Sequence, residues 1–359
     1  MQYANYQSRS VPRLCIVVRR RYSHTRYDCP SVAQLRSDPI RIVVRFLSRH
    51  VPICRLTSRC ALCHAGVLVL LLSPASGSAQ ELEPRTYSAS PVGTNFVVFG
   101  YTYLTGNVLT DPSLPVTNVQ ARFNTFSLGY ERTFGVFGHT ASMAFAVPYT
   151  RGNLSGNVLD VPTEAYRAGM GDLRIRFAFN LIGSPALSAE EFARRAPTGS
   201  VGLSLTMSAP TGQYVPSRLV NVGTNRWAFK PEIGISQPLG NWFFEVTVGT
   251  WFFTTNNDFF RGNQHSQDPL LTFQLHGGYA FGPGFWIAVD IGYADGGGTS
   301  LNGVSDQDRQ SNVRYGLTLS APLARRWSAK LALSSGFITR AGGNYKEISF
   351  TLQYHWFEQ

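Results

Sequence analysis

Side chains able to do acid–base or nucleophilic chemistry are few after residue 80. A hydrolase needs a nucleophile and a general base in contact, and the histidines of this region are His139, His265, His276 and His355. Serine and threonine are so frequent that no pairing with a histidine stands out. The sequence holds no G-x-S-x-G, H-E-x-x-H or P-loop motif. It therefore predicts neither an enzyme nor a bound cofactor.

Acidic residues gather in two loop-like stretches where calcium binding deserves a test. Asp258 lies near His265 in one stretch, and Asp295, Asp306 and Asp308 lie in the other. A calcium loop needs oxygen ligands at regular positions, and that spacing is missing. The pattern favours solvated acidic loops over a metal site, so no metal is expected.

Charge and cysteine are distributed unevenly along the chain. Residues 1–60 hold 12 arginines against two aspartates, a net charge of +10, whereas the remaining 299 residues hold 20 Lys and Arg against 19 Asp and Glu. All five cysteines precede residue 64. The region after residue 80 is nearly neutral, which argues against a nucleic-acid partner. It also lacks thiols, which suits export through an oxidising compartment.

A secretory signal peptide is predicted over residues 55–79. Arg55 and Arg59 precede an apolar run over residues 65–72, and a small-residue stretch ends at Ala79, where cleavage is expected. The apolar run is about half of the roughly 20 residues that a helix needs to span a bilayer. A permanent membrane anchor is therefore disfavoured.

Residues 1–54 precede this signal, although a signal peptide normally opens a chain. They are rich in arginine, contain no lysine and show no clean hydrophobic period, which is not the pattern of a folding unit. We interpret them as an extension outside the natural product, with translation starting near Val51 or Leu56. The alternative, a basic arm that binds nucleic acid, is disfavoured for an exported protein.

Residues 80–359 alternate between apolar and polar side chains with a two-residue period. In residues 312–321, Val313, Tyr315 and Leu317 share one face of an extended chain, and the residues between them are polar or small. Such alternation places the two sets on opposite faces of a strand. Twelve such segments start near Asn95, Phe123, His139, Gly171, Gly199, Arg226, Trp242, Asp268, Gly284, Asn312, Trp327 and Asn344.

The connections between these segments are sorted by length. Alternate connections are long and rich in Gly, Asn, Asp and Ser, as in residues 295–303, and others are tight, as in residues 237–241 and 281–284. A soluble sandwich has no reason to sort its loops, whereas an outer-membrane barrel has long extracellular loops and short periplasmic turns. We therefore predict an all-β fold, a transmembrane up-and-down antiparallel β-barrel of about 12 strands, filling residues 80–359 and placed in the bacterial outer membrane.

One connection on the short-turn side breaks the rule because it is long. Residues 183–198 contain a capping-box pattern, from Ser188 to Glu191, which predicts a short helix running to Arg195. Two roles stay open for this connection, a periplasmic surface helix or a cover over the pore mouth.

Tryptophan positions indicate two membrane interfaces, where amphipathic rings are favoured. Ordinary core aromatics are the alternative. The expected girdles are Trp242, Trp286, Trp327 and Trp356 on the short-turn side, and Trp227 and Trp251 toward the long loops.

Charged residues on the polar face of the strands are the candidate functional residues. Charge on a lipid-facing surface is costly, whereas a lumen tolerates it, so these side chains are predicted to face inward. Because both signs are present, they either form cross-strand ion pairs that fill the barrel or line a hydrated passage. The candidate pore-lining residues are Arg174, Arg176, Lys230, Glu232, Glu245, Asp290, Arg314, Lys330 and Glu347.

Five stretches of the sequence are residues 83–85 (EPR), 91–96 (PVGTNF), 209–214 (APTGQY), 225–231 (NRWAFKP) and 267–269 (QDP). In these stretches the chain resembles a known family of outer-membrane barrel proteins, grouped under the meta-pathway of phenol degradation and described as transporters. The resemblance covers nearly all of residues 81–356. It implies a barrel that passes aromatic or other hydrophobic compounds. The chain departs from the family pattern at its end, where Glu358 and Gln359 follow the terminal aromatic residues.

The residues and the resemblance together predict an outer-membrane channel or transporter for passive passage of small, aromatic or hydrophobic, molecules. The alternative from another class is a non-conducting barrel that acts as an outer-membrane enzyme or as a structural or adhesion protein. The expected partners are membrane lipid and lipopolysaccharide, the barrel-insertion machinery and a small-molecule substrate.

Overall fold

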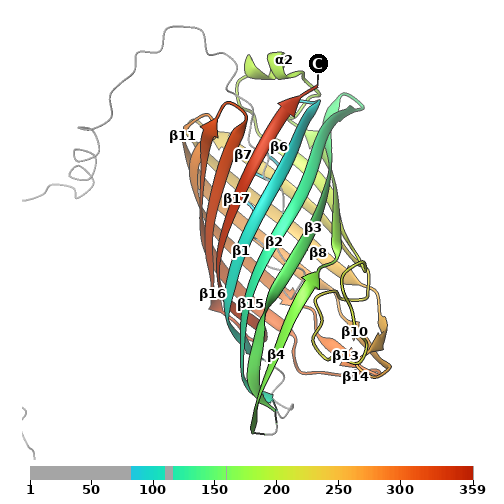
Figure 1. Cartoon of the computed structure of the whole chain (residues 1–359). Helices are drawn as coiled ribbons and strands as arrows, with labels where there is room; N and C mark the ends of the chain where they lie inside the picture. The colour runs from blue at the N-terminus through green and yellow to red at the C-terminus, as the bar shows by residue number, and fades with distance from the viewer. Residues whose placement is uncertain (1–81, 110–115, 159, 359) are drawn as a thin grey trace, which may run out of the picture. The chain divides into compact units, whose positions relative to one another are not determined.

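Twelve antiparallel strands close into a barrel in the computed structural model (Figure 1). The structure describes residues 82–109, 116–158 and 160–358, so the predicted signal peptide and N-terminal extension lie outside the described residues. The predicted fold class and strand number are confirmed. The barrel strands are β1 (Thr94–Leu109), β2 (Val116–Val136), β3 (His139–Val158), β5 (Leu173–Ile182), β6 (Ser200–Ala209), β7 (Ala228–Leu239), β8 (Trp242–Phe253), β11 (Leu270–Gly282), β12 (Phe285–Gly296), β15 (Gln310–Ala324), β16 (Trp327–Ile338) and β17 (Gly342–Phe357).

The barrel closes between its first and last strands. β1 pairs with β17 from Thr94 opposite Phe357 to Leu109 opposite Gly342, and its other edge pairs with β2. Each remaining barrel strand is hydrogen-bonded to the strand before and after it in the ring. Closure gives the backbone N–H and C=O groups of these strands the hydrogen-bond partners that lipid cannot supply.

The two faces of the strands reverse the pattern of a soluble protein. On β7, the outward Ile233 and Ile235 are 45% and 49% exposed, whereas the inward Lys230 and Glu232 are 5% and 6% exposed. The same alternation runs around the barrel, with large apolar side chains outside and polar ones inside. An apolar outer belt of this kind is the surface that a bilayer covers.

The connections differ at the two ends of the barrel as predicted. Tight turns join β2 to β3, β7 to β8, β11 to β12 and β15 to β16. Phe137 and Gly138, in the first of these turns, both have positive φ, 47° and 76°, as the two-residue hairpin turn requires. Because short turns face the periplasm in such barrels, this end is the periplasmic end.

The long connections carry further strands that the two-residue period did not predict. β4 (Val161–Met170) pairs with residues 149–158 of β3, away from the periplasmic turns. β5 pairs with residues 141–146 of β3, nearer the periplasmic end. At the same end of the barrel as β4, a small four-stranded sheet has the order β14-β13-β10-β9 (Figure 1). Its strands are β9 (Asn256–Phe259), β10 (Asn263–Gln267), β13 (Thr299–Leu301) and β14 (Val304–Ser305).

The long periplasmic connection contains α2 (Ala189–Ala193), with the predicted capping box at Ser188. The helix ends before Arg194, earlier than expected. Hydrogen bonds from Ser188 hold the pKa of the Glu191 carboxyl below its ordinary value. None of the residues of α2 is buried. Within the described ranges, no helix has the length and apolar character needed to cross a membrane.

Two of the six tryptophans contradict the predicted girdles. Trp286 and Trp251 are 1% and 7% exposed and face the lumen. In the two-residue alternation of its strand, each lies on the same face as the inward polar residues. Trp227, Trp242 and Trp327 are exposed on the outer face, between 42% and 54%.

Candidate functional site

All nine candidate residues lie on the inward face of the barrel wall. Lys230 and Glu232, two positions apart on β7, form an ion pair with 2.9 Å between Nζ and Oε2. Arg314 and Glu347 approach to 3.7 Å across the lumen side of β15 and β17. Most of these side chains are buried, and Arg174 and Glu347 are partly buried. Their proximity shows that both signs of charge are compensated inside the barrel.

An N-terminal segment, residues 82–93, crosses the lumen and contacts several of these residues. The Glu83 carboxylate lies 3.2 Å from Lys330 Nζ, and the Glu83 backbone N–H donates to Gln274 Oε1 at 3.1 Å. The Leu82 side chain lies against Gly292 and Gly316 on the wall, where any larger residue would collide with it. The segment therefore begins against β11, β12, β15 and β16.

Glu245 binds the middle of the N-terminal segment. Its carboxylate accepts hydrogen bonds from the Arg85 backbone N–H, from Ser88 Oγ at 3.0 Å and from Ser236 Oγ at 2.6 Å. Multiple donors stabilise an ionised carboxylate in a buried place. Glu245 is 2% exposed and thus joins the segment to β8.

Tyr87 anchors the segment to β6 and β7. Its hydroxyl bonds to Ser204 Oγ at 2.8 Å and donates to Glu232 Oε1 at 3.0 Å. Its ring lies so close to Gly202 and Gly234 that a Cβ at either glycine would clash with it. The glycines of β6 and β7 therefore form a slot for this ring.

The segment leaves the lumen at the periplasmic end. Thr133 Oγ1 donates to the Pro91 carbonyl at 2.7 Å, and the Val92 N–H donates to the Leu187 carbonyl at 2.8 Å. Leu187 belongs to the long connection that holds α2. This connection is therefore hydrogen-bonded to the segment where the segment leaves the lumen, a contact that neither of the two predicted roles includes.

The lumen has two unlike sides. On the inward face of β1, β2 and β3, as described, Glu131 is the charged residue, and its neighbours are small, hydroxyl-bearing or apolar. An apolar cluster joins Leu104 of β1 and Ala121 of β2 to Tyr345 of β17. All nine candidate charges lie on β5 to β17. Among the described residues, the lumen therefore has a wall with a single inward charged residue on β1 to β3 and a wall with many charged residues on the other strands.

Sequence reasoning missed several lumen residues. His276 Nδ1 lies 2.7 Å from Asp290 Oδ1, and Thr318 Oγ1 donates to Asp290 Oδ2 at 2.6 Å. The two-residue alternation of β11 and β12 puts His276 and Trp286 on inward faces. The sequence therefore held the signal that could have identified both as lumen residues. The N-terminal segment has no two-residue or helical period, and nothing in its sequence predicted its path.

The other residues considered for chemistry are scattered. His139 lies at the periplasmic turn against Phe179, and His265 stacks on Phe259 in the small sheet at the opposite end. Burial, together with the nearby Arg226, lowers the pKa of His265. Among the described residues, no group of three or more His, Cys, Asp or Glu side chains is placed to hold a metal.

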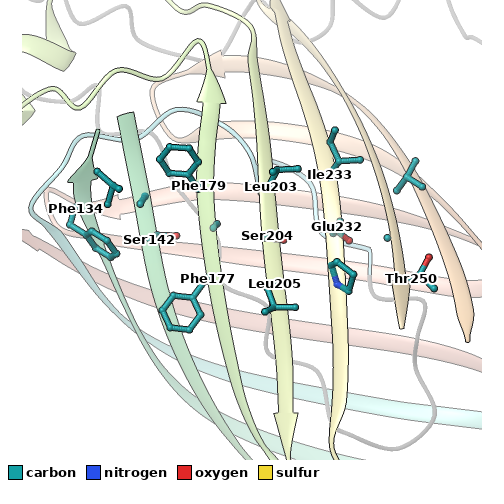
Figure 2. A pocket seen from close by; sticks show the side chains of 16 residues that line it. Phe134, Ser142, Phe177, Phe179, Leu203, Ser204, Leu205, Glu232, Ile233 and Thr250 are labelled. Carbon is teal, nitrogen blue, oxygen red and sulfur yellow. The ribbon is translucent and has the colours of Figure 1, made fainter. Parts of the chain in front are cut away.

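The outer face of the barrel has an apolar groove of about 700 Å³ across β2, β3, β5, β6, β7 and β8. Figure 2 shows Phe177, Phe179, Leu203, Leu205 and Ile233 along neighbouring strands of this groove. These side chains lie on the outward face of their strands and belong to the lipid-facing belt. The groove is therefore part of the membrane surface of the barrel.

Solved structures with a similar fold are outer-membrane barrels. The "COG4313 outer membrane channel from Pseudomonas putida F1" is 20% identical, with a TM-score of 0.66, over 77% of this chain and 100% of that chain. The TodX monoaromatic hydrocarbon channel deltaS2 mutant is 11% identical, with a TM-score of 0.44, over 77% and 93% of the two chains. The KdgM porin is 7% identical, with a TM-score of 0.39, over 72% and 98%. The last two are too dissimilar to support a functional comparison. None of the curated proteins matches the sequence significantly.

The closed barrel, its apolar belt and its polar interior are those of a protein of the bacterial outer membrane. Residues 92–354 match the family described as "Putative MetA-pathway of phenol degradation", and this stretch includes all twelve strands of the wall except residues 355–357 at the end of β17. The chain therefore belongs to that family.

Proposed function

We propose that this protein is an outer-membrane channel for the passive passage of small aromatic or other hydrophobic molecules. The observation that carries the proposal is the nature of the obstacle inside the barrel. It is a segment that precedes β1 and is held by side-chain contacts, such as those of Glu83, Tyr87 and Ser88. Such a segment can leave the lumen while every strand of the wall stays paired.

The family description and the wall of β1 to β3, whose one inward charged residue among those described is Glu131, support the substrate class. An aromatic ring gains from contact with apolar side chains such as Leu104 and Tyr345, while a polar substituent can face the charged wall. In this proposal the nine candidate residues line the passage once the segment is displaced. Lys330, Glu232 and Glu245 would then exchange contacts with the segment for contacts with water or substrate.

Planar-bilayer conductance of the refolded protein tests the proposal. We expect small, intermittent conductance for the intact barrel and a larger, steady conductance after deletion of residues 83–90, with phenol entering vesicles faster than a sugar of similar size. Glu190→Ala, on the exposed surface of α2, should leave both measurements unchanged. Faster migration of the unboiled protein on a gel must first show that each variant is folded.

A folded barrel that conducts in neither form would overturn the channel and leave the non-conducting alternative. An outer-membrane enzyme would then lose hydrolysis of lipid or peptide when His139 or His265 is changed. An adhesion protein would instead depend on the four-stranded sheet. Contacts with lipopolysaccharide and with the barrel-insertion machinery, which reads the terminal strand β17, are proposed for either function.

A further inference from the structure

Arg85, in the middle of the N-terminal segment, places its guanidinium among aromatic rings of the lumen wall. Its Cζ lies 4.9 Å from the ring centroid of Phe243 and 5.9 Å from that of Trp286. The two rings meet edge to face, with centroids 5.8 Å apart. Distances below about 6 Å to a ring face are those of a cation–π contact, which is strongest where water is excluded.

The barrel wall between the Phe243 and Trp286 rings is made of small residues. Gly278 lies opposite Phe243 and Ala288 in the pairing of β8, β11 and β12, and a Cβ at Gly278 would collide with the Phe243 ring. Glu245 and His276 are direct neighbours across the same strands. We call the place formed by Phe243, Trp286, Glu245 and His276 the cation box.

Arg85 satisfies the cation box incompletely. Its guanidinium forms no ion pair with a carboxylate of the described residues, although Glu245 accepts its backbone N–H. Among these residues, Arg85 Nε, Trp286 Nε1 and His276 Nε2 are buried without a hydrogen-bond partner. A buried polar group without a partner lowers the stability of the state that contains it. A ligand that fills the cation box without leaving a buried N–H group of its own unpaired therefore has a binding advantage over Arg85.

The chemistry of the groups around the cation box indicates which ligand that is. His276 Nδ1 lies 2.7 Å from Asp290 Oδ1, and Thr318 Oγ1 donates to Asp290 Oδ2 at 2.6 Å, so Asp290 holds the imidazole in place. The box combines two aromatic rings with the Glu245 carboxylate, and both attract the positive charge of an ammonium group.

We propose that the cation box is a binding site for the ammonium group of a primary amine that carries an aromatic or other apolar group, and that Arg85 occupies it as an internal stand-in for that ligand. The inference rests on the proposed channel function and narrows its substrate class. Binding of the amine displaces Arg85 and with it the middle of the N-terminal segment. The ligand thereby favours the open lumen, because it binds that state better than the closed one.

Calorimetric binding of 2-phenylethylammonium to the refolded protein in detergent tests the cation box without requiring conductance. Arg85→Ala removes the competitor, so its affinity for the amine should rise at least tenfold, whereas the affinity for neutral 2-phenylethanol should change less than twofold. Trp286→Leu or Glu245→Gln, added to Arg85→Ala, should lower the amine affinity tenfold or more. Trp251→Leu, at the other lumen tryptophan, is the matched control and should leave it within twofold.

Three outcomes would overturn the cation box: no gain in amine affinity on Arg85→Ala, an equal gain for 2-phenylethanol, or an equal loss with Trp251→Leu. Arg85→Met replaces Arg85→Ala if the latter does not fold. A barrel that never conducts but binds the amine as described would refute the channel and leave the cation box standing. A barrel that conducts without binding the amine would do the opposite.

Discussion

The barrel wall and the N-terminal segment are held together by different forces. Every strand of the wall is hydrogen-bonded on both edges, as in the unbroken pairing of β1 with β17. The N-terminal segment forms no strand with the wall, and its backbone donates to side chains such as Gln274 and Glu245. The wall therefore resists local opening, whereas the segment depends on a few replaceable contacts.

Each region also uses its residues differently. In the wall, the outward residue needs only to be apolar, since lipid has no fixed shape, so Ile, Leu, Val and Phe exchange freely there. In the segment, Tyr87 meets two glycines and two polar partners that are fixed in place. A change in the wall should thus act through its polarity, and a change in the segment through its shape and hydrogen bonds.

The largest expected effect is a charge in the middle of the lipid-facing wall. Leu275→Arg, at the centre of β11, should lower the free energy of unfolding in lipid vesicles by about 2–4 kcal/mol, since the guanidinium is placed in hydrocarbon. Leu239→Arg, at the periplasmic end of β7, should cost no more than about 1 kcal/mol. Urea titration of the folded band measures both. Equal costs would contradict the assigned depth.

The next effect concerns the segment itself. Tyr87→Ala empties the slot at Gly202 and Gly234, and we expect it to weaken docking of the segment by about 3 kcal/mol. Tryptic cleavage after Arg85 should then be roughly 100-fold faster, because cleavage follows the open population. Tyr87→Phe keeps the ring and loses only the hydroxyl contacts, about 1–2 kcal/mol. Unchanged cleavage in both variants would show that Tyr87 does not hold the segment.

A smaller effect is expected where a loop is fixed to the wall. Asp172, fully buried at the break between β4 and β5, accepts from the Gly212 N–H, the Thr224 N–H and Thr224 Oγ1 at 2.6–2.9 Å. Asp172→Asn removes the charge from these bonds, worth about 2 kcal/mol. Cleavage by trypsin after the exposed Arg218 should become at least tenfold faster. The exposed Asp160→Asn is the control and should not alter it.

The smallest effect is a pH dependence of the four-stranded sheet. The pKa of His265 is lowered from 6.5, chiefly by burial, so the ring is neutral in the sheet and protonates more readily when the sheet opens. Protection of Arg261 from trypsin should be constant above pH 6.5 and fall below it. One proton limits the change to a factor of about ten per pH unit, and partial exposure reduces it. His265→Gln should abolish the dependence, and a sheet stabilised by acid would contradict the assigned direction.

The sequence alone determined the barrel wall, its strand number and the face that each of the nine candidate charged residues takes. Period-two alternation and sorted loop lengths suffice, because a lipid-facing barrel imposes the same rule on every strand. The rule also placed Trp286 inward between Phe285 and Ile287, although the girdle hypothesis assigned it outward. It did not predict β4, since Pro162 and the mixed residues around it alternate weakly.

Only the tertiary structure decided which groups meet inside the barrel. Glu83 and Lys330 are 247 residues apart in sequence, and Tyr87 reaches partners more than 100 residues away. Alternation gives the face of a residue but not its partner across the lumen, which depends on how the strands tilt and where the N-terminal segment crosses. The wall was therefore readable from local pattern, whereas the segment, its anchors and the cation box follow from long-range packing that a single sequence does not encode in any local period.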